Sequence, residues 1–249
     1  MLTKQDFKVQ IINADEVKNI FKSWGVSACT CYKTPEKFAE KVGKSCLQTG
    51  HFSGSRGDYI KFKITGVPRA LVDQLVRHEV GVYKNVQSQR YTDSSNMQIY
   101  YPDDITSNDE LQKLWDELTL EVKRVYDITV NTLLEKGYTN EQAREVARGI
   151  IPMNVESSLV IGFTIEALIN LMEKRLCTCS QEHIRHLANL MRKEVVKLIP
   201  DLAPKLVPAC VSKMYCPESE KRSCGIRPQK NIVESIVLDY MKTQKDKSV

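Results

Sequence analysis

The sequence predicts an α+β fold in which a central, mainly antiparallel sheet is flanked by long helices. Residues 59–64 alternate apolar and polar side chains, which is the period of a half-buried strand. Residues 107–136 instead place apolar side chains three and four positions apart, as in a long helix with one buried face. Strand signals with short helices occupy the first half of the chain, and long helices dominate the second.

In chain order, the first half begins with two predicted helices. Apolar spacing indicates helices over residues 14–24 and 35–47. The strand at 59–64 is followed by a short helix over 68–76, which a proline opens. We expect a further strand at residues 98–101, because a proline and two aspartates terminate this apolar run.

A long helix is predicted to start at a capping box. Ser107 with Glu110 three residues later is typical of a helix N-terminus, and the helical spacing lasts until about Lys136. We expect its apolar face to point toward the core. That face consists of Leu111, Leu114, Trp115, Leu118, Val122, Val125, Thr129 and Leu133.

The remaining predicted elements are helices with one strand between them. Thr139 and Gln142 form a second capping box, which starts a helix that reaches Arg148. Residues 157–163 are rich in strand-forming side chains. Three more helices are predicted, over residues 165–175, 181–199 and 231–241.

The domain organisation follows from a change in composition near residue 207. We expect residues 1–207 to form one domain of catalytic size, since this length can bury a substantial core. Residues 208–249 contain several prolines and three cysteines and would form an irregular segment that ends in a helix.

Charge and hydropathy exclude some classes of function. The net charge of +5 is mild, and it fits a small anionic ligand without requiring nucleic acid, which we do not expect as a partner. No apolar run approaches the roughly 20 residues of a membrane helix. The first ten residues lack the apolar block of a secretory signal, so we predict a cytoplasmic protein that does not bind membranes.

Eight cysteines are scattered along the chain. In a protein without a secretory signal they are more often reduced thiols that pack as small apolar groups, and we predict no metal site. The alternative is a structural zinc held by Cys210, Cys216, Cys224 and a fourth ligand. However, their separations of six and eight residues match no tight C-x-x-C motif.

One stretch carries most of the functional signal. After the predicted helix at 68–76 come Arg77, His78 and Asn85, and then an extended segment with Ser88 and Arg90. In a strand, positions i and i+2 point to the same face. A hydroxyl beside a guanidinium is suited to phosphate, because both donate hydrogen bonds to its oxygens. The other interpretation is a solvated strand edge.

These residues resemble the signature of the flavin-dependent thymidylate synthases (the ThyX family). The family signature is Arg-His-Arg, seven residues, and then Ser-x-Arg-Tyr. Here Arg77-His78-Glu79 is followed by eight residues and then Ser88-Gln89-Arg90-Tyr91, so the third residue and the spacing both differ. Further similar segments follow the family order between residues 45 and 207, namely Gly50–Ser53, Ala147–Asn154 and Leu168–Arg175 with Gln181 and Ile184.

The resemblance implies a site for dUMP. In the family, the matching residues hold the phosphate and sugar, and the late arginine, here Arg175, contacts the uracil ring. A guanidinium there stabilises negative charge that develops on the ring oxygens. We expect Arg175 and Ser88 to be catalytic. The full expected nucleotide set is Gln74, Ser88, Arg90, Arg148 and Arg175.

The resemblance also implies an FAD site, but its residues are altered. Glu79, Val86 and Glu166 stand where the family usually has Arg, an acidic residue and Arg. An Arg-to-Glu change reverses the charge next to a pyrophosphate and removes contacts to it. Arg56 could restore one of these phosphate contacts. The expected cofactor set is His51, Ser53, Arg77, His78, Asn85 and Asn170.

The implied reaction transfers a one-carbon unit from methylenetetrahydrofolate to C5 of dUMP and gives dTMP, with FAD recharged by NADPH. Family sites form where the chains of a homotetramer meet, so Arg148 and Arg175 would face Ser88 and Arg90 of a neighbouring chain. Two alternatives remain open: a dUMP hydroxymethylase on the same scaffold, and a non-catalytic nucleotide-binding relative that has lost FAD.

Overall fold

The computed structural model describes residues 1–245, and of residues 242–245 only the backbone. The chain forms two compact units, each built from two segments. The sheet unit consists of Met1–Asn13 and Ile60–Phe163, and the helical unit consists of Ala14–Tyr59 and the chain from Thr164 onward. Neither unit begins or ends at residue 207, so the predicted domain boundary there stays a prediction. The last four residues of the segment 208–249 lie outside the described residues.

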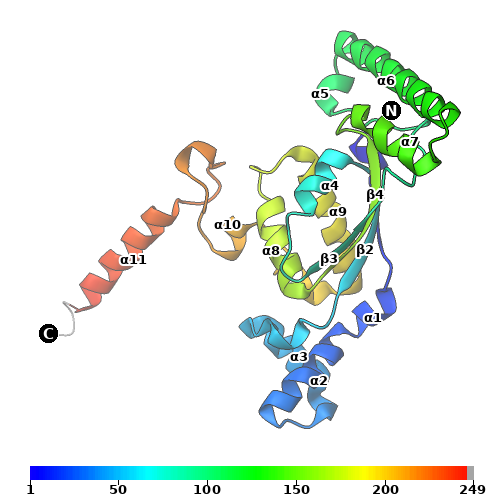
Figure 1. Ribbon diagram of the computed structural model, residues 1–249. Coiled ribbons are helices and arrows are strands. Elements are labelled where there is room, and N and C mark those ends of the chain that lie inside the picture. The colour runs from blue at the N-terminus through cyan, green and yellow to red at the C-terminus, as the bar shows by residue number, and fades with distance from the viewer. Residues whose placement is uncertain (246–249) are drawn as a thin grey trace. The chain divides into compact units, whose positions relative to one another are not determined.

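The sheet unit contains a four-stranded sheet (Figure 1). Its strands are β1 (Lys8–Ile11), β2 (Ile60–Pro68), β3 (Val82–Val86) and β4 (Glu156–Phe163), in the order β1-β2-β4-β3. Each pair of neighbouring strands is antiparallel. The predicted α+β class with an antiparallel sheet is therefore confirmed.

The two central strands, β2 and β4, form the core of the sheet. Alternate residues of β2 are fully buried, in agreement with the alternation in its sequence. The Phe62 and Phe163 rings meet edge to face with centroids 6.2 Å apart. A register shift between Ile64 and Val67 contains Gly66, whose φ of +74° and closeness to the Asp6 carbonyl leave no room for a side chain.

Four helices accompany the sheet: α4 (Arg69–Leu75), α5 (Asp103–Thr106), α6 (Asp109–Glu135) and α7 (Asn140–Ala147). The capping box of Thr139 and Gln142 is present at α7, as predicted. The predicted cap of α6 is wrong by one residue. Asn108 accepts the hydrogen bond from the Leu111 amide at 3.0 Å, because Ser107 instead closes α5 by donating its amide to the Asp103 carbonyl.

The predicted core-facing stripe of α6 is buried only in part. Val122 belongs to a cluster with Tyr126 and Tyr101, and Trp115 packs against it. Leu114 and Leu118, by contrast, are 54% and 63% exposed. The expectation that the whole stripe faces the core is therefore wrong, because the cluster contacts the side of α6 that carries Trp115, Val122, Tyr126 and Val130, and Leu114 and Leu118 lie outside that side.

Three strand assignments differ from the prediction. Residues 98–101 form only isolated bridges, between Ile99 and Val155 and between Tyr100 and Leu2, instead of a regular strand. Strands β1 and β3 were not predicted. They have four and five residues, too few for a periodic signal, and their pairing with β2 and β4 defines them.

The helical unit contains α1 (Ala14–Lys18), α2 (Ile20–Tyr32), α3 (Ala39–Thr49), α8 (Ile165–Arg175), α9 (Glu182–Leu198), α10 (Ala209–Ser212) and α11 (Lys230–Lys245). Gly25 on α2 and Gly43 on α3 allow close backbone approach. An added Cβ would lie 1.7 Å from the Ala39 carbonyl oxygen or 2.0 Å from that of Phe21. No helix among the described residues is long and apolar enough to cross a membrane.

Candidate functional site

Ser88 and Arg90 lie in a turn directly after β3. Pairing of β3 with β4 ends at Val86. The Ser88 hydroxyl accepts a hydrogen bond from the Arg90 amide at 3.3 Å, and the Thr92 hydroxyl donates to the Ser88 carbonyl at 2.7 Å. The prediction that Ser88 and Arg90 share one strand face is therefore wrong, because this local hydroxyl-to-backbone turn replaces the strand. Both residues remain exposed.

The Arg90 guanidinium is positioned by two neighbours. Its Nε lies 3.1 Å from a Glu145 carboxylate oxygen on α7, and its centre lies 5.6 Å from the Tyr91 ring centroid. Both side chains of the ion pair are about half exposed. Such a pair is weak in water. Glu145 therefore orients Arg90, and an anion of higher charge can still bind the guanidinium.

Arg148 lies on the same part of the sheet unit. It begins a 3-10 turn (Arg148–Ile150) at the end of α7, one helical turn after Glu145, and its side chain is exposed. Gln74 is half-buried on α4. The structure thus places four of the five predicted nucleotide residues in the sheet unit. Arg148 lies at the end of α7, the helix that carries Glu145, the ion-pair partner of Arg90.

Two arginines that the sequence analysis did not assign hold the turn at residues 87–92. Arg69 on α4 donates to the Gln87 carbonyl at 3.4 Å, and Arg144 on α7 donates to the Tyr91 carbonyl at 3.2 Å. The Arg144 Nε is buried without a hydrogen-bond partner among the described residues. Arg144 is four residues before Arg148, a helical spacing that could have suggested its role.

A polar cavity of about 220 Å³ adjoins this turn. It is lined by backbone and side chains on both sides of Ser88, and by residues from the start of β4. The lining includes Gln87, Gln89, Thr92, Ser94, Ser157 and Ser158. The lining also carries the carboxyl groups of Asp93 and Glu156. Such a cavity offers hydrogen bonds to a sugar, whereas its acidic groups disfavour a phosphate.

Arg175 belongs to the helical unit. It is the last residue of α8 and is half-buried, and this burial lowers the pKa of its guanidinium. Arginine keeps its charge in proteins in spite of such a shift. A cation with part of its hydration shell removed interacts strongly with a partial negative charge on a ligand.

Two of the predicted cofactor residues line a cavity in the helical unit. His51 and Ser53 lie at a cavity of about 580 Å³ whose walls also include Trp24, Cys31 and Asp58. Asp58 accepts a hydrogen bond from Ser23 at 2.8 Å, and burial raises the pKa of its carboxyl group. Trp24 is fully buried, and its indole Nε1 has no hydrogen-bond partner among the described residues.

The other predicted cofactor residues are elsewhere. Asn170 is exposed on α8 of the helical unit. Arg77, His78 and Asn85 belong to the sheet unit, where Arg77 and Asn85 are exposed and His78 is half-buried. Within the described residues, the expected FAD set is therefore divided between the two units.

The sequence departures at residues 56 and 166 compensate each other. Arg56 lies in the loop after Ser53, and its Nε donates to the Glu166 carboxylate on α8 at 3.3 Å. Arg56 was expected to restore a phosphate contact, but here its guanidinium binds Glu166 instead. The negative charge of Glu166 is thereby offset within the protein.

The cavity beside His51 and Ser53 has the volume of a small-molecule site. Such sites span roughly 300–1,000 Å³, and its volume of about 580 Å³ lies inside this range. Aromatic and small side chains line it together with a histidine, a serine and an aspartate.

Comparison with known proteins identifies the family of the chain. The family described as "Thymidylate synthase complementing protein" matches residues 14–201. A flavin-dependent thymidylate synthase of Nitratidesulfovibrio vulgaris is 33% identical over 184 residues, covering 74% of this chain and 75% of its own. A flavin-dependent thymidylate synthase of Pyrococcus furiosus is 30% identical, with 79% and 81% of the two chains covered.

A solved structure shares the fold. The UMP/dUMP methylase PolB of Streptomyces cacaoi, bound with 5-Br dUMP, aligns with a TM-score of 0.59 and 19% identity. The alignment covers 82% of this chain and 96% of that one. The family match and the two relatives above place the chain among enzymes that act on nucleotides. The chain belongs to the family of flavin-dependent thymidylate synthases.

Proposed function

We propose that this enzyme transfers a one-carbon unit from methylenetetrahydrofolate to C5 of dUMP and releases dTMP. The observation that carries the proposal is its family membership over residues 14–201 together with the turn of Ser88 and Arg90. The relatives named above are flavin-dependent thymidylate synthases, so the hydroxymethylase and non-catalytic alternatives are not favoured.

The dUMP phosphate would bind at the turn of the sheet unit. Arg90 and Arg148 supply charged donors, and the Ser88 hydroxyl supplies a neutral one. A dianionic phosphate interacts more strongly with Arg90 than the exposed Glu145 carboxylate does, because it carries more charge and more acceptor oxygens. Gln74 and the polar cavity beside the turn would hold the sugar.

The uracil ring would be activated by Arg175. Negative charge grows on the ring oxygens when C5 becomes a nucleophile, and a half-buried guanidinium stabilises that charge more than water does. Because none of the matched nucleotide motifs contains a cysteine, we propose that this electrostatic activation replaces attack by a thiol.

Part of FAD would bind in the cavity of the helical unit, next to His51, Ser53 and Trp24. Further contacts would come from the other expected cofactor residues, Arg77, His78, Asn85 and Asn170. When bound, FAD reduced by NADPH supplies the hydride of the reaction, and methylenetetrahydrofolate supplies the carbon. The protein positions these groups and limits the access of water to the uracil ring.

We further propose a homotetramer in the cytoplasm, with residues 1–207 as the catalytic part. The partly exposed stripe of α6 supports the assembly. Large apolar side chains that no neighbour in the chain covers are typical of surfaces between subunits.

Complementation tests the proposed function. A bacterial strain that requires thymidine because it lacks its own thymidylate synthase should grow without thymidine when it expresses this chain. The Arg90→Ala variant, produced at the same level, should fail to support growth. Growth that is absent with the wild-type chain, or that is equal with Arg90→Ala, would contradict the proposal.

A further inference from the structure

Five of the eight cysteines gather around the end of α8. Cys177 and Cys179 follow this helix, and Cys210, Cys216 and Cys224 belong to the segment 208–229. None of the cysteines, all of which the structure describes, is in a disulfide. This cluster lies wholly within the helical unit.

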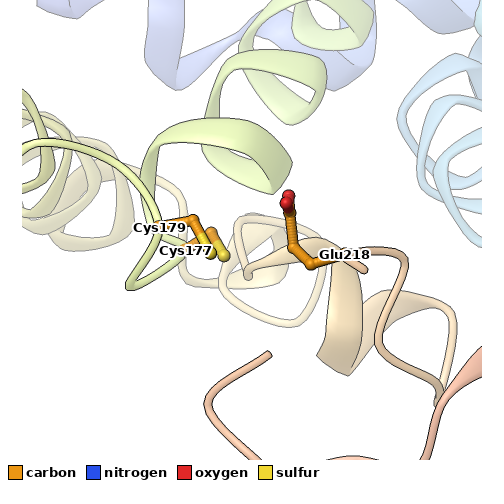
Figure 2. Close-up of side chains that lie close together, drawn as sticks. All are labelled: Cys177, Cys179 and Glu218. Carbon is orange, nitrogen blue, oxygen red and sulfur yellow. The ribbon is translucent and has the colours of Figure 1, made fainter. Parts of the chain in front are cut away.

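Three potential ligand atoms are already close together (Figure 2). The Sγ atoms of Cys177 and Cys179 and a carboxylate oxygen of Glu218 all lie within 4.8 Å of one another. Figure 2 shows the two thiols on one loop and Glu218 on a separate segment of the chain. The Cys179 thiol also donates to the Arg222 carbonyl at 2.9 Å, which fixes the loop that carries it.

The other thiols of the segment adjoin this group. Burial raises the pKa of Cys210, and the neighbouring thiols of Cys177, Cys224 and Cys216 raise it further. Cys224 is hydrogen-bonded to the Ile226 amide and to the side chain of Thr178, and these bonds lower the pKa of its thiol. Thr178 stands between Cys177 and Cys179 in the sequence. The Cys210 thiol is therefore close enough to interact with the thiols of Cys177, Cys216 and Cys224, and Cys224 lies next to the loop that carries Cys177 and Cys179.

The segment 208–229 has almost no core of its own. Cys216 is its one buried residue among those described, and α10 with a three-residue 3-10 turn is its only helical structure. The Cys216 amide bonds to the Pro228 carbonyl at 2.8 Å and closes the segment into a loop. Exposed pairs such as Arg222 with Glu218 contribute little stability. Small irregular segments of this kind usually need a covalent or metal cross-link.

We propose that this cluster binds one Zn²⁺, which fastens the segment 208–229 to the end of α8. Cys177 and Cys179 supply two thiolate ligands, and the segment supplies the other two from Cys210, Cys224, Cys216 and Glu218. Tetrahedral thiolate sites are typical of structural zinc, and zinc releases the thiol protons when it binds.

The composition of the cluster favours a metal over disulfides. Five thiols cannot all pair, and Cys177 and Cys179 are separated by a single residue, which is too close for an ordinary disulfide. A carboxylate oxygen within the group has no role in a disulfide, whereas it is a normal zinc ligand.

Metal analysis of the purified full-length chain tests this site. Elemental analysis should find about one zinc per chain after dialysis, and only background iron. The Cys177→Ser, Cys179→Ser double variant should lose this zinc. Cys31→Ser changes an exposed cysteine outside the cluster and should keep it. Absence of zinc from the wild-type chain, stoichiometric iron with sulfide, or full retention of zinc by the double variant would overturn the proposal.

A second measurement applies even if the double variant does not fold. Wild-type protein treated with a chelator should become sensitive to proteases between residues 208 and 229, while its circular dichroism stays largely unchanged. Added Co²⁺ should restore resistance and produce the visible absorption of a thiolate-bound ion. A segment that stays resistant after all zinc is removed, or a non-reduced mass that shows two disulfides among these cysteines, would overturn the proposal.

Discussion

At the scale of single residues, the exposed ion pair of Arg90 with Glu145 bears on the proposed phosphate site. Glu145 holds the guanidinium near the turn, yet both side chains are about half exposed. Exposed pairs contribute about 0–1 kcal/mol, whereas hydrogen bonds to charged groups contribute about 1.5–3 kcal/mol. The pair therefore orients Arg90 at little energetic cost to phosphate binding.

The Arg90→Ala variant should weaken dUMP binding at least tenfold, because a charged donor to the phosphate is lost. Isothermal titration calorimetry provides the measurement. The matched control is Glu145→Gln, which removes the competing carboxylate and should bind dUMP as tightly as the wild-type chain or more tightly. Equal affinity in Arg90→Ala and wild type would show that the phosphate binds elsewhere.

Trp24 offers a second test at this scale. Trp24→Phe keeps an aromatic ring in the cavity but removes the buried indole N–H that has no partner in the described chain. Loss of one neutral hydrogen bond should weaken FAD retention roughly twofold to tenfold, measured by flavin fluorescence during dilution. The chain's other tryptophan, Trp115 on α6, provides the control. If Trp115→Phe releases FAD as readily, the cavity is not the flavin site.

At the scale of elements, α6 shows an apolar stripe that one chain covers only in part. Val122 and Tyr126 are buried, but Leu114 and Leu118 are more than half exposed. Periodicity predicted the helix and its apolar face, because both depend on local spacing. It could not predict what covers that face, because a helix buried by its own chain and one buried by another subunit have the same pattern.

The double variant Leu114→Lys, Leu118→Lys should shift the protein from a tetramer toward smaller species, because charges replace apolar contacts in the interface. Light scattering after size-exclusion chromatography gives the mass. Lys113→Ala on the same exposed stretch of α6 should leave the mass unchanged. A wild-type chain that is already monomeric, or a double variant that stays tetrameric, would remove α6 from the interface.

Other elements show which sequence signals were sufficient. The box of Thr139 and Gln142 correctly marked the start of α7, because both hydrogen bonds are local. The strand expected at Ser88 and Arg90 was wrong, since a serine hydroxyl can satisfy the backbone in a turn as well as a neighbouring strand can. Short β1 depends on its long-range pairing with β2, which no local pattern encodes.

At the scale of the whole molecule, the predicted site residues are distributed over two units. Ser88, Arg90 and Arg148 belong to the sheet unit, and Arg175 belongs to the helical unit with His51. Motif order in the sequence identified these residues, but it carries no information about which of them share a unit. Arg69 supports the turn through a tertiary contact that no local pattern encodes, whereas the spacing of Arg144 before Arg148 was a local signal for the second supporting arginine.

Mixed oligomers test whether one site takes residues from two chains. Arg90→Ala and Arg175→Ala should each reduce turnover at least tenfold when pure. Co-expressed, they should regain a measurable part of the activity, because some sites then combine two intact arginines. Activity of the mixture equal to the average of the two pure variants would instead place both arginines in one chain's site.

We propose that the enzyme methylates dUMP at C5. The most direct measurement is the mass of the nucleotide formed from dUMP, methylenetetrahydrofolate and NADPH by the purified, FAD-loaded chain. We predict a product with the mass of dTMP, formed only when all components are present. A nucleotide with the mass of hydroxymethyl-dUMP, or unchanged dUMP under these conditions, would contradict the claim.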